Sequence, residues 1–373
     1  MRPIDLPPGV PGIPMTAYRR LARHLNGFAR TWRRVTALGW AGVLVLASGR
    51  PLAAEGAEAR VPLLSDAEAW RRLPKTEDGG GGRLPAWARA LAASLPRTTA
   101  AMLELDWRQR AASPLDHQLR GKLRWTVAHA NQCEYTMAYA VADLARAGLD
   151  QEKIAALGQL DESAPPAERA ALALARKLTL SGTTVSDDEV ADLTRFYGDK
   201  QLVAVVLMVA YANFQDRLAL ALGLEVEPDG PLPPVKVRFS ATPDSERTAV
   251  PERTPPAEPP AEPPDEQTAS NVADADWLSA DFHDLQDKLE AQRRRPPRIA
   301  VPSWEDVRDL LPPGPARAQP LGIRWSLVCL GYQPELARGW SACTRCFAEE
   351  AQQDRVFEDS LFWVVTRSID CFY

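Results

Sequence analysis

A run of paired prolines and acidic residues divides this 373-residue chain into two parts, because such a run cannot build a core of its own. Between Thr254 and Pro264, Pro-Pro pairs alternate with Ala-Glu. Proline fixes φ and has no backbone N–H, so such a stretch is expected to be extended and semi-rigid. The composition changes from about Glu225 onwards, and we expect a disordered, acidic, Pro-rich linker over residues 227–279.

The part before the linker, residues 61–226, carries helix signals along its whole length. Prolines stand at the expected helix starts, where a missing N–H costs little, and glycines stand at the expected ends. No run alternates at period two, which predicts an all-α domain. The helices are expected at 84–94, 96–111, 115–131, 133–147, 151–158, 166–180, 186–197 and 200–222.

The part after the linker, residues 280–373, repeats some of the first part. When the chain is shifted by 238 positions, the separation of Cys371 from Cys133, residues 325–373 align on 87–135 without a gap. Eight residues are identical, five of them in the pattern Leu-x-Trp-x-Val…Cys-x-Tyr. We interpret this as a second, incomplete helical repeat. If its apolar helices cannot close a core, the residues after 280 are expected either to be poorly ordered or to dock on the first domain.

Residues 1–57 have the order of a secretory signal. A segment rich in arginine precedes an uncharged run from Val35 to Gly49, and small residues follow. The uncharged run is too short to span a bilayer comfortably, so no stable membrane span is expected. The segment predicts export or membrane attachment. The alternative is a cytoplasmic protein with a leader created by an upstream start codon.

Composition excludes several classes of function. The net charge of −5 argues against a nucleic-acid surface, which needs clustered Lys and Arg. Five cysteines, an odd number in a long chain, argue against a disulfide framework. With only four histidines and no phosphate-binding loop or metalloprotease motif, we expect neither a metal site nor a cofactor.

The segment from Leu115 to Tyr135, and Tyr211–Leu218 followed by Leu222-Gly223-Leu224, resemble the alkylhydroperoxidase D / carboxymuconolactone decarboxylase family. The resemblance covers about 84–226 and the C-terminal part at 323–373. It implies a small all-α bundle that usually oligomerises. It also implies thiol-dependent peroxide reduction, through a Cys-x-x-Cys-x-x-x-His motif and an upstream Glu.

The first domain departs from that pattern at three positions. Cys133 holds the first Cys position, but the second is Thr136, the His position is Ala140 and the Glu position is Gly121. Two thiols are needed because a second thiol must capture the sulfenic acid before over-oxidation. The two-thiol mechanism is therefore not expected in this domain.

Cys133 is still the strongest single candidate. His129 lies four residues earlier, so on an unbroken helix the two would share a face, and an imidazolium there would lower the pKa of the thiol. The alternative is a buried structural cysteine, a common environment for free Cys.

The second repeat provides further candidates. Cys371 begins a second Cys-x-x-Cys-like motif, and Asp359 holds its acidic position. The sequence stops at Tyr373, inside that motif, which is more typical of a fragment or a frameshift than of a domain end. Cys343 and Cys346 also form a Cys-x-x-Cys, which we interpret as a coincidence because no further Cys or His lies near to complete a metal site.

Two hypotheses about function follow. The first is a peroxiredoxin-type antioxidant enzyme that a thiol reductant protein regenerates, impaired in this chain. The second is a non-catalytic helical scaffold or oligomerisation module, able to form a homo-oligomer.

Overall fold

The structure is a computed structural model that describes residues 59–77, 79–158, 163–240, 282–311, 317–318, 320–351 and 353–368. The leader at 1–57, the linker from 241 onwards and Cys371 lie outside the described residues.

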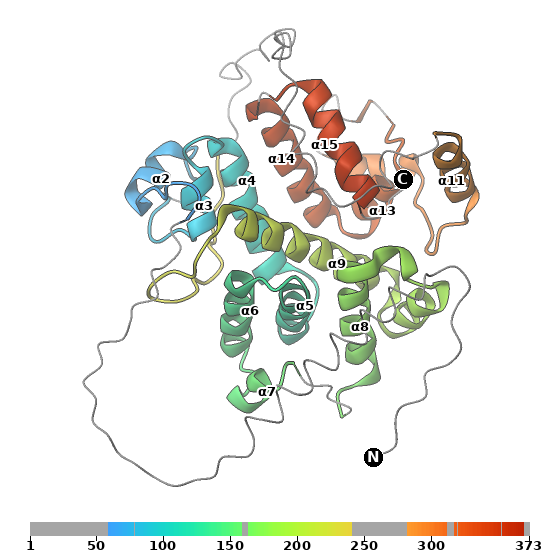
Figure 1. Cartoon of the computed structure of the whole chain (residues 1–373), viewed down its shortest axis with the longest axis horizontal. Helices are drawn as coiled ribbons and strands as arrows, with labels where there is room; N and C mark the ends of the chain where they lie inside the picture. Colours follow the sequence, from blue (N-terminus) through green and yellow to red (C-terminus); the bar gives the residue numbers. More distant parts are fainter. Residues whose placement is uncertain are drawn as a thin grey trace, which may run out of the picture. The chain divides into compact units, whose positions relative to one another are not determined.

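The described part of the chain is helical, which confirms the all-α prediction (Figure 1). It contains no sheet, and Thr76 and Phe239 form an isolated antiparallel bridge. The first domain comprises α2 (Asp66–Arg72), α3 (Ala86–Leu91), α4 (Pro96–Trp107), the π-turn η1 (Arg108–Ala112), α5 (His117–Ala130), α6 (Glu134–Arg146), α7 (Gln151–Ala155), α8 (Pro166–Ser181), the 3₁₀ turn η2 (Gly182–Thr184) and α9 (Asp187–Leu222). The C-terminal part comprises α11 (Phe282–Arg294), α12 (Trp304–Val307), the 3₁₀ turn η5 (Arg308–Leu310), α13 (Arg324–Tyr332), α14 (Pro334–Glu350) and α15 (Arg355–Ser368).

Local sequence sets most of the helix ends. Ser65 with Glu68 and Ser186 with Glu189 form capping boxes that satisfy the first backbone N–H groups of α2 and α9. Gly223 ends α9 in the left-handed conformation. Gly198, with φ 69° and ψ 164°, interrupts α9, so the two helices expected at 186–197 and 200–222 follow one another directly across a kink.

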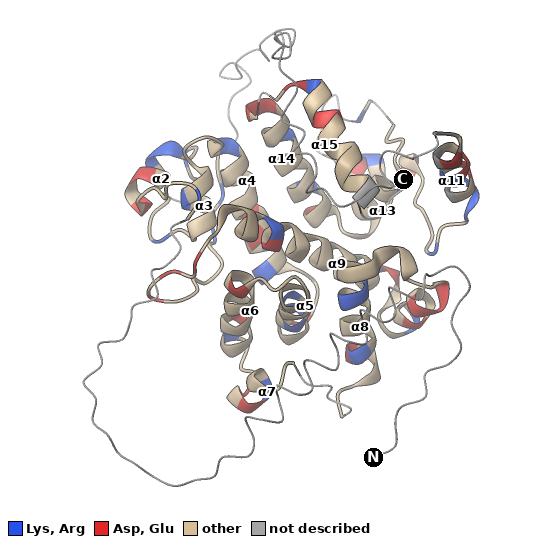
Figure 2. Cartoon of the chain, in the orientation of Figure 1, with Lys and Arg blue, Asp and Glu red and all other residues tan. Residues whose placement is uncertain are grey.

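The C-terminal half of α9 is the centre of the domain. It carries no charge from Gln201 to Gln215 and is drawn almost wholly tan in Figure 2. One side packs with α5 and α8 in a cluster that includes Leu123, Leu174 and Met208. Within the part of the chain that the structure describes, α9 is also the one helix long and apolar enough to cross a membrane, but most of its apolar stretch is buried inside the protein, as in a core helix.

The domain extends further than the change in composition suggested. Residues 227–240, which we expected to begin the linker, pack on the helices. Glu227 and Leu232 are buried, and the backbone N–H of Phe239 donates to Glu104 at 2.8 Å. The contacts of Glu227, Leu232 and the Phe239 N–H hold this segment on the domain, although its composition favours an extended chain.

A buried ion cluster joins four segments of the domain. Arg110 of η1 binds Asp106 of α4 at 2.9 Å and Asp143 of α6 at 2.8 Å. Arg124 of α5 binds the same Asp143 at 2.5 Å. Arg110 also donates to the carbonyl of Leu232, at 3.0 Å. Burial alone would raise the pKa of Asp143, but Arg110 and Arg124 reverse that effect and lower it to about 2.

The C-terminal helices dock on the first domain. α14 packs along α4, and α13 packs on α9 and α14 (Figure 1). Val328, Cys329 and Leu336 are buried against Val203 and Leu207 of α9. α15 is different, because apolar side chains such as Phe357 and Phe362 are 57% and 66% exposed.

Replacing the shared acid of the ion cluster should destabilise the domain strongly. Asp143→Ala leaves the buried guanidinium of Arg124 without its partner and removes one of the two partners of Arg110. Breaking a buried pair in this way costs about 3–5 kcal/mol. Urea unfolding followed by circular dichroism measures the loss. Asp150→Ala is the matched control, because Asp150 pairs with Lys153 at 3.7 Å on the exposed surface and its loss should leave the midpoint unchanged. Equal midpoints for both variants would contradict the role of the cluster.

Candidate functional site

The candidate site lies where the chain turns from α5 into α6. α5 ends at Ala130, and Gln132 adopts φ 56°, the left-handed conformation that reverses the chain direction. Cys133 then takes the N-cap position of α6 in extended conformation. The residues of the family motif therefore sit at a helix junction and not within one helix.

Cys133 is enclosed in the core. Its side chain is 1% exposed, and its thiol lies 3.8 Å from the backbone carbonyl of Asp216, in donor geometry. Burial raises the pKa of the Cys133 thiol, and the nearby Asp216 carboxylate raises it further, while hydrogen bonds from Thr136 and Tyr135 partly oppose the rise. A thiol in these surroundings is mostly protonated at neutral pH, and the thiolate is the reactive form.

The prediction that His129 and Cys133 share one helix face was wrong. It required an unbroken helix, and the turn at Gln132 separates the two residues. His129 is exposed, and its ring stacks on Trp125 with centroids 4.7 Å apart. The charged group that acts on the Cys133 thiol is instead the carboxylate of Asp216, which raises the pKa of the thiol and so opposes its ionisation.

Thr136, at the second thiol position, is bound to a buried acid. Its hydroxyl donates to Asp216 at 2.5 Å, and the side chain of Asn131 donates to the other carboxylate oxygen at 2.8 Å. Asn131 also donates to Asn213 at 3.0 Å. Asp216 is fully buried, and burial raises the pKa of its carboxyl although these two hydrogen bonds oppose the rise. The network links α6, the α5–α6 turn and α9.

The positions of the expected proton relay are filled by packing. Gly121, at the acid position, faces Leu144, and a Cβ built there would lie 2.5 Å from Leu144 Cγ. Ala140, at the histidine position, is 0% exposed. A side chain at position 121 would therefore have to displace Leu144 of α6, and a longer one at position 140 would have to fit into the core.

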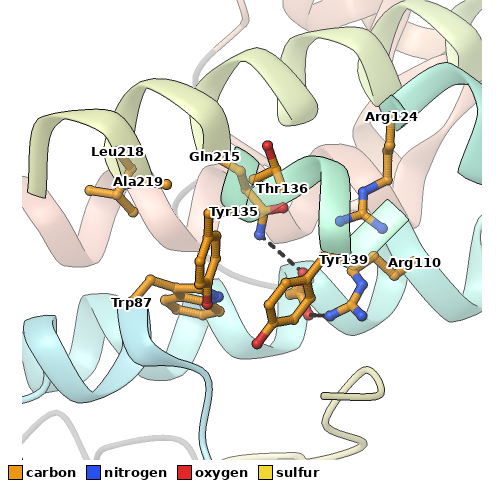
Figure 3. A pocket seen from close by; sticks show the side chains of 10 residues that line it. Trp87, Arg110, Arg124, Tyr135, Thr136, Tyr139, Gln215, Leu218 and Ala219 are labelled. Carbon is orange, nitrogen blue, oxygen red and sulfur yellow. Dashed lines mark hydrogen bonds and ion pairs between the residues drawn. The ribbon is translucent and has the colours of Figure 1, made fainter. Parts of the chain in front are cut away.

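The space beside Thr136 is small and is lined by both polar and apolar side chains (Figure 3). A cavity of about 10 Å³ lies among the side chains of Thr136, Gln215, Tyr135, Tyr139 and other residues of α4, α5 and α9. A volume of this size is near the lower limit for one water molecule.

Tyr139, which lines this cavity, and Glu227, which binds the lining residue Tyr135, have buried polar atoms without a protein partner. Tyr135 donates to Glu227 Oε1 at 3.0 Å, and the backbone N–H of Ala86 donates to the same oxygen at 2.7 Å. Glu227 Oε2 and the Tyr139 hydroxyl have no hydrogen-bond partner within the protein. Water is the ligand that such a space can accept.

A larger hollow, of about 610 Å³, lies elsewhere, between the C-terminal end of α4 and the start of α14. Trp107, Lys236 and Tyr332 line it, and Cys133, Thr136 and Asp216 do not. Of these two spaces, the one large enough for a substrate is therefore not at the family motif.

The candidates of the second repeat do not form a site among the described residues. Asp359 is exposed on α15 and pairs with Arg355 at 3.6 Å. Cys371 lies outside the described residues. Cys343 and Cys346 lie on α14 as free cysteines, and burial raises the pKa of each, to about 12 for Cys343. Within the described ranges no group of His, Cys, Asp or Glu could hold a metal ion.

The sequence did not reveal the partners of Thr136 and Asp216. They are 80 positions apart, so no local pattern joins them. The one available signal was an acid, Asp216, at the end of a long apolar stretch, because an acid on a core helix needs a buried partner.

Comparison with known protein families gives a match over part of the chain. Residues 96–177 match the model of the carboxymuconolactone decarboxylase family. The match runs from α4 into α8 and includes Cys133 and the α5–α6 turn. No curated protein matches the chain.

Adding even a methyl group at Gly121, the position of the family's acid, should lower the free energy of unfolding. Gly121→Ala is expected to destabilise by roughly 1–3 kcal/mol, because Leu144 is fully buried and cannot give way. Thermal and urea unfolding measure the change. Gly182→Ala is the control, since a Cβ there meets no atom within 4 Å. Adding Leu144→Ala to Gly121→Ala should cost less than the sum of the two single changes; strict additivity would contradict the contact.

Proposed function

The segment from Pro96 to Lys177 belongs to the carboxymuconolactone decarboxylase family, and from this premise we propose that the chain is a non-catalytic, alkylhydroperoxidase-like helical module in which the peroxide chemistry of the fold is lost. The observation that carries the proposal is the hydrogen bond from Thr136 to Asp216. The position where peroxidase-active relatives are expected to hold the attacking thiol here serves a buried structural contact.

The chemistry of the remaining thiol supports this proposal. Peroxide attack needs a thiolate, and the surroundings of Cys133 favour the protonated thiol. A sulfenic acid formed there would also need a second thiol for its capture. The raised pKa of Cys133 and the absence of a thiol at position 136 therefore both argue against peroxide reduction.

Decarboxylation is the other activity that the family name suggests, and it needs an accessible acid or base. Asp216 has the raised pKa that such a group needs. Its side-chain oxygens, however, accept hydrogen bonds from Thr136 and Asn131, and the residue is fully buried. Because Asp216 is fully buried, holds these two hydrogen bonds and does not line the larger hollow, we propose a structural role for it.

Peroxide consumption tests the proposal directly. With hydrogen peroxide and dithiothreitol, the wild-type chain is expected to turn over no faster than Cys133→Ser or the control Cys329→Ser. Intact mass after peroxide treatment should show no oxygen added at Cys133 in the folded protein, and addition once urea unfolds it. Turnover that is present in the wild type and in Cys329→Ser, but lost in Cys133→Ser, would sink the proposal and favour a lone-thiol peroxidase that takes electrons from a reductant protein.

A second variant separates the missing thiol from the missing proton relay. Thr136→Cys restores Cys-x-x-Cys and should allow a disulfide on mild oxidation, seen as a loss of two hydrogens in mass. Because Gly121 and Ala140 provide no relay, its peroxide turnover should remain at the level of Cys133→Ser.

A further inference from the structure

α14 lies antiparallel along α4. Glu350, at the end of α14, contacts Arg97 and Thr98 at the start of α4. In the middle, the two helices approach closely, because a Cβ built at Gly339 would lie 3.0 Å from Leu105. At the other end, Leu336 and Trp107 line the same hollow.

α14 has the same place in the C-terminal part as α4 has in the first domain. Shifted by the 238 positions that separate Cys371 from Cys133, α14 covers 96–112, which is α4 with η1, and α15 covers 117–130, which is α5. The residue before each helix has the same uncommon backbone, with φ −133° and ψ 57° at Leu95 and φ −138° and ψ 63° at Gln333. A proline follows at the first helical position in both.

The start of the next helix repeats the correspondence. Asp116 accepts a hydrogen bond from the N–H of Leu119, three residues later, at 3.1 Å. Asp354 accepts one from the N–H of Phe357, also three residues later, at 3.0 Å. Sequence identity, helix bounds and backbone angles at the helix starts thus agree on one register.

Two equivalent helices that pack antiparallel on each other form the pattern of an isologous interface, in which contact of i with j implies contact of their counterparts. The counterparts of Gly339 and Leu105 are Ala101 and Cys343. Cys343 is buried and belongs to the same apolar cluster as Ala101. The docked face also includes α9, where Trp340 packs edge-on against Phe214, with centroids 5.6 Å apart.

The helices α4 and α14 differ at one end of their contact, where the start of α4 meets the end of α14. Leu95 gives α4 no side-chain cap and Pro96 has no N–H, so the N–H groups of Arg97 and Thr98 need another acceptor. Glu350 supplies it, with both distances 2.7 Å, and it also accepts from the Thr98 hydroxyl at 2.6 Å.

Glu349 adds an ion pair with the Arg97 side chain. The counterparts of Glu349 and Glu350 at the end of η1 are Ala111 and Ala112, which can offer neither an acceptor nor a charge. An α4 helix of another molecule would therefore leave these groups of α4 unsatisfied.

We infer that the face formed by α4 and α9 is a docking face for a unit of its own kind, and that this chain fills it from within, with α13 and α14 selected by Glu349 and Glu350. The partner that fits this face is thus an equivalent helical unit, held in the same chain, and the two acids favour it over α4 of a second copy. The inference does not depend on whether Cys133 is reactive.

Disulfide trapping in the full chain tests the equivalent contact. Ala101→Cys places a thiol opposite Cys343, and mild oxidation is expected to link the two within one chain, identified by peptide mass and by monomer mobility on a non-reducing gel. Ala101→Cys with Cys343→Ser is the control. Absence of the link, or a link found only between chains, would overturn the inference.

The role of the two acids is tested in the same background. Glu349→Ala with Glu350→Ala copies the Ala-Ala of η1, and it should speed amide exchange in peptides 95–112 and 333–351 by at least tenfold. Links between chains should then appear. Peptides of α5 and α8 should exchange as before, which shows that the domain stays folded. Asp192→Ala, which removes the exposed pair with Arg195, should change nothing. Unchanged exchange in both segments with a purely monomeric link would overturn the selection by Glu349 and Glu350.

Discussion

The structure depends on how a guanidinium group deep in the domain is neutralised. Arg110 is 2% exposed at its side chain, and an unpaired charge at that depth would be prohibitive. Asp106 of α4 and Asp143 of α6 neutralise this charge by forming ion pairs with Arg110, and these pairs fix both helices against η1. Tyr211 donates to the same Asp106 at 2.6 Å, which ties in α9. The relative positions of α4, α6 and α9 follow from this cluster, and the candidate site lies between those helices.

Much of the fold could be predicted from the sequence, because its helices begin and end at local signals. The capping boxes at Ser65 and Ser186, the prolines at 96 and 166 and the glycine at 223 all act within four residues of their position. The all-α class and nearly every helix of the first domain follow from them. The boundary near residue 227 was placed too early, because composition does not reveal that a single Glu227 or Leu232 finds a buried partner.

The geometry of the candidate site could not be predicted from local sequence signals. One left-handed residue, Gln132, separates His129 from Cys133, and glutamine carries no signal for that conformation. The contact of Thr136 with Asp216, and that of Thr98 with Glu350, join residues 80 and 252 positions apart. Both contacts use polar groups to satisfy buried partners. The same principle explains the site and the docked α14: polar groups serve packing here, whether within the domain or against its C-terminal counterpart.

The most direct test of this structural role is the free energy of unfolding of Thr136→Val, an exchange of similar shape that removes only the hydroxyl. If the network serves stability, Asp216 loses a donor in the core and the protein should lose about 1–3 kcal/mol, measured by urea unfolding at neutral pH. In a working active site, polar groups are often held at a cost, and their removal leaves stability unchanged or raises it. A Thr136→Val protein as stable as the wild type, or more stable, would contradict the account.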